Sequence, residues 1–262
     1  MPSYIQPSLP RHVYIDTLKS QVPSQLRETV KADPEFKNAP ASAKKGGPPP
    51  LAGTAKAMAE GYTCRTQQPL SIFDHLTDVG NELVRWPRGH VINYAALRTG
   101  YPSPDDALFA AYQMAAAVIE WNTRRVGVTF NWVSDIDDAA FVLQYGGRNG
   151  AALASAFLPN DKPLNSVFVY SLAFDPEYKA VMKNVFLHEL GHVLGLRHEF
   201  SREDETPLRL ERFGKVNSMS VMGYNLVPVI QETDVADANK LYTCPEGIPI
   251  QGMVIRSSDP NY

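Results

Sequence analysis

Apolar and polar positions follow a helical period in one long stretch of the chain. Five apolar residues recur there every three or four positions: Ala107, Ala111, Met114, Val118 and Trp121. Just before them, Ser103 is followed by Pro104 and two aspartates. Serine as the cap, proline in the first turn and acids at the positive end of the dipole are typical of a helix N-terminus. The pattern predicts a long amphipathic helix that packs on a sheet.

Short apolar segments separated by turn residues surround this helix. We expect strands over five segments, at residues 91–94, 126–133, 139–144, 151–157 and 166–172. A second helix is expected over residues 178–194, and it is apolar nearly all round, which indicates that it is buried. Residues 203–217 are polar and loop-like, and Thr233 with Asp234 should cap a last short helix that ends near Tyr242.

This order of elements predicts an α+β fold. A twisted mixed sheet should pack on the long helix and on the helix at 178–194, with a cleft between that second helix and the edge strand of the sheet. The part of the chain that follows should form an irregular C-terminal subdomain.

The first 62 residues have a different composition from the rest. Proline recurs through them, and residues 39–53 consist almost entirely of the small, proline and lysine residues of a linker. Two interpretations remain open for residues 1–62, a flexible leader or a propeptide-like docking segment. We expect residues 63–262 to form the folded domain.

Composition excludes several classes of partner. The chain is 44% hydrophobic and 20% charged, with a net charge of −3 and no basic cluster, so nucleic acid is not an expected partner. It has neither an apolar run long enough to span a membrane nor the apolar segment of a secretory signal. We expect a monomer that is either cytoplasmic as written or secreted after a leader has been removed.

The segment HELGHVLGLRH at residues 188–198 carries the chemistry. His188 and His192 are four residues apart, so both rings project from one face of a helix, where imidazole nitrogen binds zinc well. Gly195 allows the left-handed conformation that ends a helix, so the chain can bring His198 back as a third ligand. Glu189 can reach a zinc-bound water as a general base. Three ligands leave one position open, as a single catalytic zinc requires.

A purely structural interpretation has these histidines hydrogen-bonded in a buried helix. Three of the six histidines in the chain fall within these eleven residues, which favours a metal site instead.

The motif HExxHxxGxxH resembles the long zinc signature of the metzincin metallopeptidases. The segment SVMGY at residues 220–224 resembles their Met-turn, with Met222 standing 24 residues beyond His198. Tyr224 is similar to the tyrosine of the astacin and serralysin branches, which the resemblance implies is a distant metal ligand that steadies the transition state. Glu199, directly after His198, also fits the astacin pattern.

A second stretch is similar to the matrixin branch. The segment LASAFLP at residues 153–159 resembles the edge strand that holds substrate. The resemblance implies that an extended peptide pairs with the backbone of four residues: Leu153, Ala154, Ser155 and Ala156. The alternative is an internal strand that is already paired on both sides. Ser155 stands where matrixins have a structural-zinc ligand, so we expect one zinc only.

The resemblance runs from about residue 86 to residue 242 and implies a zinc-dependent endopeptidase of mixed astacin-like and matrixin-like character, acting on proteins or peptides. Glu189 and Tyr224 would be catalytic, while Met222 would fill space beneath the histidines. Two other functions stay open: a latent zincin controlled by its N-terminal segment, and a non-catalytic zinc-binding interaction protein.

Cys64 and Cys244 are the two cysteines of the chain. We expect a disulfide between them, because they flank the predicted domain and the bridge would close a long loop. Cys64 as a thiolate ligand that keeps the zinc site latent is a second interpretation, and two unpaired thiols are a third.

Overall fold

The computed structural model describes Cys64, Thr66 and residues 82–199, 217–224, 227–250 and 253–258. The predicted leader at residues 1–62 and nearly all of the polar stretch at 203–217 lie outside these residues. None of the helices in the described part of the chain is long and apolar enough to cross a membrane.

Five strands form the main sheet, in the order β3-β2-β4-β6-β5. They are β2 (Val91–Ala96), β3 (Thr129–Trp132), β4 (Phe141–Tyr145), β5 (Ala154–Ser155) and β6 (Asn165–Val169). Neighbouring strands are parallel except β5, which is antiparallel to β6 and forms an edge. The mixed sheet of the predicted α+β fold is therefore confirmed, although β5 has fewer ladder residues than the predicted strand at 151–157.

The predicted long helix is α4 (Pro104–Arg124). Its cap is Ser103, whose hydroxyl accepts a hydrogen bond from the backbone N–H of Asp106 at 3.1 Å. The helix ends where Arg125 takes a left-handed conformation, with φ of 53°. Both boundaries follow from local chemistry, as the sequence predicts at the N-terminal end.

The second helix is shorter than predicted. The stretch after β6 first forms a 3₁₀ turn (Ser171–Phe174) and the single-turn helix α5 (Pro176–Lys179), and only then α6 (Met182–Val193). Val181, at φ −111° and ψ 10°, lies outside the helical region and separates α5 from α6. Tyr178, Val181 and Val185 keep helical spacing across this break, so periodicity alone predicts one helix.

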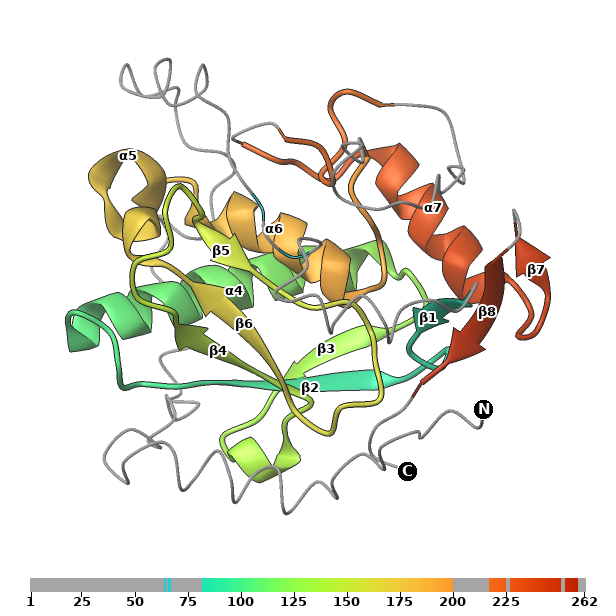
Figure 1. Cartoon of the computed structure of the whole chain (residues 1–262), viewed down its shortest axis with the longest axis horizontal. Helices are drawn as coiled ribbons and strands as arrows, with labels where there is room; N and C mark the ends of the chain where they lie inside the picture. Colours follow the sequence, from blue (N-terminus) through green and yellow to red (C-terminus); the bar gives the residue numbers. More distant parts are fainter. Residues whose placement is uncertain are drawn as a thin grey trace, which may run out of the picture.

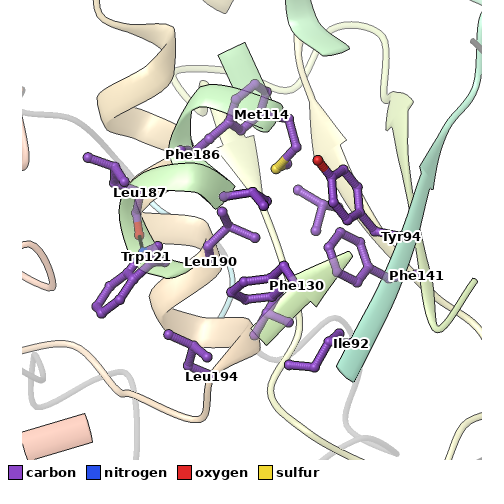
Figure 2. Packing of buried hydrophobic residues seen from close by; sticks show 14 of the residues in the cluster. Ile92, Tyr94, Met114, Trp121, Phe130, Phe141, Phe186, Leu187, Leu190 and Leu194 are labelled. Atoms are coloured by element: carbon purple, nitrogen blue, oxygen red, sulfur yellow. Dashed lines mark hydrogen bonds between the residues drawn. The ribbon is translucent and has the colours of Figure 1, made fainter. Parts of the chain in front are cut away.

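Helices α4 and α6 pack against each other and against one face of the sheet, and β5 lies beside α6 (Figure 1). Figure 2 labels buried side chains from the strands and from both helices: Ile92, Tyr94, Met114, Trp121, Phe130, Phe141, Phe186, Leu187, Leu190 and Leu194. Full burial of each such side chain contributes about 1.5–3 kcal/mol. The core therefore fixes α6 at the edge of the sheet where β5 lies.

The C-terminal part contains more regular structure than expected. Helix α7 (Glu232–Thr243) is capped by Gln231 rather than by Thr233, because Gln231 and Asp234 form a reciprocal capping box. A small second sheet has the order β1-β8-β7, from β1 (Glu82–Arg85), β7 (Pro249–Ile250) and β8 (Met253–Ser257). β1 and β8 are parallel partners far apart in sequence, which no local pattern reveals.

Candidate metal centre

Three aromatic side chains donate hydrogen bonds to carbonyls of α6 and of the residue that follows it. The indole N–H of Trp121 donates to the carbonyl of Leu187 at 2.9 Å, and that of Trp86 donates to the carbonyl of Val193 at 2.8 Å. The hydroxyl of Tyr242 donates to the carbonyl of Leu194 at 2.8 Å. Val193 and Leu194 lie at the end of α6, where carbonyls have no partner within the helix. Trp86 and Tyr242 therefore satisfy groups that burial would otherwise leave unpaired, while Trp121 adds a bond to a carbonyl in the middle of the helix.

Gly195 follows α6 and reverses the direction of the chain. It has φ of 98°, and its N–H donates to the carbonyl of His192 at 2.8 Å while the N–H of Leu196 donates to the carbonyl of Gly191 at 2.9 Å. These two bonds make a Schellman motif, which favours glycine at the left-handed position. The predicted role of Gly195 is confirmed, because the turn brings His198 back towards the helix.

The three motif histidines converge through their Nε2 atoms. These atoms are 3.2 Å apart for His188 and His192, 3.3 Å for His188 and His198, and 3.1 Å for His192 and His198. Tetrahedral zinc with Zn–N bonds of about 2.05 Å places its nitrogen ligands about 3.3 Å apart. All three residues are buried. The donor set therefore fits a zinc ion.

The second nitrogen of two rings is tied to the backbone. His188 Nδ1 lies 2.7 Å from the carbonyl oxygen of Val221, and His192 Nδ1 lies 2.9 Å from that of Leu196. A carbonyl only accepts, so Nδ1 carries the proton and Nε2 keeps its lone pair for the metal. Burial, followed by the charges of His198 and His188, lowers the pKa of His192 well below its ordinary value and keeps the ring neutral. Neutral imidazole is the form that binds zinc.

The Met-turn (residues 220–224) lies beneath the histidines. The N–H of Gly223 donates to the carbonyl of Ser220 at 3.0 Å, which closes a tight turn. Met222 is buried, and its sulfur would lie 2.3 Å from a Cβ placed on Gly191. The absence of a side chain at Gly191 makes room for the thioether of Met222 against α6.

Asp234 on α7 holds the Met-turn. Its Oδ1 accepts from the hydroxyl of Ser220 at 2.5 Å, and its Oδ2 accepts from the N–H groups of Val221 at 2.9 Å and Gln231 at 2.7 Å. The carboxylate is buried. Sequence reasoning expected Asp234 only as a helix cap, because nothing in the local pattern points from α7 back to the Met-turn.

Two further predicted residues lie at the centre. The ring of Tyr224 is 5.0 Å from the ring of His198, centroid to centroid, at an angle of 45°. Glu199 Oε1 accepts a hydrogen bond from the N–H of Asn217 at 2.8 Å, and the N–H of Glu199 donates to the carbonyl of Met222 at 3.0 Å. Tyr224 is therefore beside the third histidine, while Glu199 links the segment after that histidine to the Met-turn.

Cys64 lies beside the three histidines and is not bonded to Cys244. Its sulfur is 3.6 Å from His192 Nε2 and 3.8 Å from Glu189 Oε2, and both cysteines are free. The donor atoms of Cys64 and the three histidines all lie within 4.8 Å of one another. The predicted Cys64–Cys244 disulfide is therefore wrong for this structure. Burial and the charge of Glu189 raise the pKa of the Cys64 thiol. A cation bound among these donors would lower that pKa, because it stabilises the thiolate.

Thr66 is a residue that sequence reasoning missed. Its hydroxyl donates to Glu189 Oε2 at 2.8 Å and accepts from the N–H of Ala156 at 2.8 Å. No motif contains Thr66, and its position two residues after Cys64 is the only sequence feature that connects it with the site.

The predicted substrate strand is an edge strand, so the alternative of an internal strand is wrong for the described residues. Within it, β5 pairs with β6 on one side only. The hydroxyl of Ser155 is 2.7 Å from that of Tyr170, and the carbonyl of Leu153 accepts from the N–H of Tyr170 at 2.9 Å. The strand lies beside α6 and presents the N–H of Ala156 to the segment that carries Cys64 and Thr66.

A family model and solved structures match parts of this chain. A family model described as Met-zincin matches residues 173–246, the segment that holds the three histidines, the Met-turn and α7. No curated protein matches the chain. Among the solved structures that match is high choriolytic enzyme 1, a hatching-enzyme zinc protease from the medaka fish Oryzias latipes. It is 15% identical, with a TM-score of 0.41, and the match covers 59% of this chain and 90% of that one.

Proposed function

We propose that this chain is a zinc-dependent endopeptidase of the metzincin type, with Glu189 as its general base. The observation that carries the proposal is the convergence of the His188, His192 and His198 Nε2 atoms to 3.1–3.3 Å with the carboxylate of Glu189 on the same helix. The Met-zincin match over residues 173–246 supports it.

The three histidines would hold the metal. Zinc bound there supplies a Lewis acid, which polarises a carbonyl and lowers the pKa of water to about 7. The bonds of His188 and His192 to backbone carbonyls fix both rings before any ligand arrives. The centre is thus preorganised by the Met-turn and by the end of α6.

The proposed reaction assigns proton transfer to Glu189. This residue precedes Leu190 on the helix that carries two of the ligands, and its Oε2 lies 3.8 Å from the Cys64 sulfur. In the proposed reaction its carboxylate takes a proton from water and gives it to the amine that leaves when the peptide bond breaks. Tyr224, beside His198, donates its hydroxyl to the oxygen that gains negative charge.

The substrate is a peptide or protein in extended form. Because β5 is the edge of the sheet and lies beside α6, a peptide can add to it as a further antiparallel strand. The N–H of Ala156 is one of the backbone donors that would pair with it. The mixture of astacin-like and matrixin-like features in this site remains a prediction.

A second candidate is a latent form of the same enzyme, and the position of Cys64 favours it. Tetrahedral zinc with a sulfur bond of about 2.3 Å places sulfur about 3.6 Å from a nitrogen ligand. The separation of the Cys64 sulfur from His192 Nε2 is 3.6 Å. The thiolate would be the fourth ligand and would fill the position that water needs.

Peptide hydrolysis by purified protein tests the proposal. The Cys64→Ser variant should cleave a peptide library, a chelator should abolish cleavage, and added zinc should restore it. If latency holds, the unsubstituted chain should cleave more slowly than the variant. Zinc binding without hydrolysis by either protein would contradict the peptidase and support a non-catalytic zinc-binding protein.

A further inference from the structure

We infer that Thr66 is a latch, a side chain whose one hydroxyl closes the candidate active site by joining its general base to its substrate strand. The inference rests on the proposed function and deepens it by naming how the site is regulated.

The hydroxyl of Thr66 connects α6 with the residue that follows β5. It donates to Glu189 Oε2 on α6 at 2.8 Å and accepts from the N–H of Ala156, next to β5, at 2.8 Å. A hydroxyl has one proton to donate and lone pairs to accept with, so it makes both bonds at once. No apolar side chain of the same size has this capacity.

Thr66 also orients the neighbouring thiol. The Cys64 sulfur is 3.2 Å from Thr66 Oγ1, and the N–H of Thr66 lies 3.4 Å from that sulfur. The contacts place the sulfur on the side of His192, where its separation from Nε2 is 3.6 Å. The short segment that carries both residues therefore acts on the histidines, on Glu189 and on the edge strand together.

Each bond of the latch occupies a group that the reaction needs. A carboxylate that accepts from Thr66 is held away from water, and an N–H that donates to Thr66 is not free for a peptide. Glu189 is fully buried, so its charge needs such a donor while the segment is in place. When Thr66 moves away, water can form hydrogen bonds with both the carboxylate and the N–H. Loss of the hydroxyl therefore weakens the closed form and leaves the open form unchanged.

The rate at which iodoacetamide alkylates Cys64 measures opening directly. The experiment uses the full-length, zinc-loaded chain, with peptide mass spectrometry to separate Cys64 from Cys244. Thr66→Val should alkylate Cys64 about ten- to a hundredfold faster than the unsubstituted chain, since a hydrogen bond to a charged group is lost. Thr66→Ser, which keeps the hydroxyl, should stay within about threefold. Cys244 should react equally in all three proteins.

Equal Cys64 rates in Thr66→Val and in the unsubstituted chain would overturn the latch. Thr66→Ala serves as a second variant without the hydroxyl, and a rate matching that of Thr66→Ser would overturn it too. The readout involves no catalysis. If Cys64→Ser cleaves no peptide, the proposed peptidase fails, while the alkylation rates still decide whether Thr66 holds the segment.

Discussion

The imidazole of His188 is connected to the carboxylate of Asp234 through the backbone of Val221. The carbonyl of Val221 lies 2.7 Å from His188 Nδ1, and the N–H of the same residue donates to Asp234 Oδ2 at 2.9 Å. A residue of α7 therefore fixes the orientation of a predicted zinc ligand on α6. Groups that orient metal ligands in this way tune the affinity for the metal.

Asp234→Asn should lower the affinity for zinc by about ten- to a hundredfold. The amide NH₂ group cannot accept from the N–H of Val221 or from the hydroxyl of Ser220, so one of these donors loses its partner and the Met-turn loosens. Competition with a chromophoric chelator measures the effect. Asp237→Asn, on the same helix, is the matched control and should bind zinc normally. Equal affinities in the two variants would exclude this role for Asp234.

The stability contribution of Asp237 should depend on pH. Burial, followed by the charges of Glu199 and Asp234, raises the pKa of Asp237 above its ordinary value of 3.8. The folded chain then binds this proton more readily than the unfolded chain, so stability falls as the pH rises from about 4 towards neutrality. Asp237→Asn should raise the melting temperature at pH 7 and have almost no effect below pH 4.

The side chain of Asp237 is half-buried, so solvent screening should keep this gain within about 1 kcal/mol. Melting curves of both proteins from pH 3.5 to pH 7 make the comparison. A difference that is the same at every pH would show that the charge of Asp237 is not its cause.

Tyr224→Phe should lower kcat by about a hundredfold or less and leave KM nearly unchanged. The ring lies beside His198, and the hydroxyl should act mainly in the transition state, where negative charge develops on oxygen. Steady-state kinetics on one peptide, in the Cys64→Ser background, separate the two constants. A rise in KM with kcat unchanged would instead assign the hydroxyl to substrate binding.

Thiol titration should find two free thiols in the denatured, unreduced chain. Cys64 lies among the histidines, and Cys244 is the residue that ends α7. The two are therefore separate in the fold, although they flank the domain in the sequence. Titration of Cys244→Ser, which should show one thiol, is the control. A titration that finds no free thiol would show that the two cysteines form the disulfide after all.

Much of the site could be predicted from the sequence because its ligands are local. His188, His192, Gly195 and His198 fall within one helix and its C-terminal turn, so spacing alone places them. The helix pattern of α4 and its Ser103 cap are equally local. Met222 was assigned because its segment, and its distance in sequence from His198, resemble a Met-turn. The Met-zincin match covers that segment.

The contacts that were missed join segments far apart in the chain. Thr66 contacts Ala156 and Glu189, and Asp234 contacts Val221, each through a hydrogen bond that no period or motif encodes. The flanking positions of Cys64 and Cys244 suggested a bridge, but flanking in sequence does not require proximity in space. The break before α6 was missed because Tyr178, Val181 and Val185 keep helical spacing across it, although no residue of α5 is buried.

The most direct test of the central claim compares Cys64→Ser with the double variant Cys64→Ser, Glu189→Ala. Zinc content by elemental analysis and cleavage of one peptide are measured on the same samples. Because Glu189 is proposed to move protons and not to bind the metal, both proteins should carry one zinc per chain, while the double variant should lose nearly all cleavage. Cleavage within tenfold of the Cys64→Ser protein at equal zinc content would contradict the account.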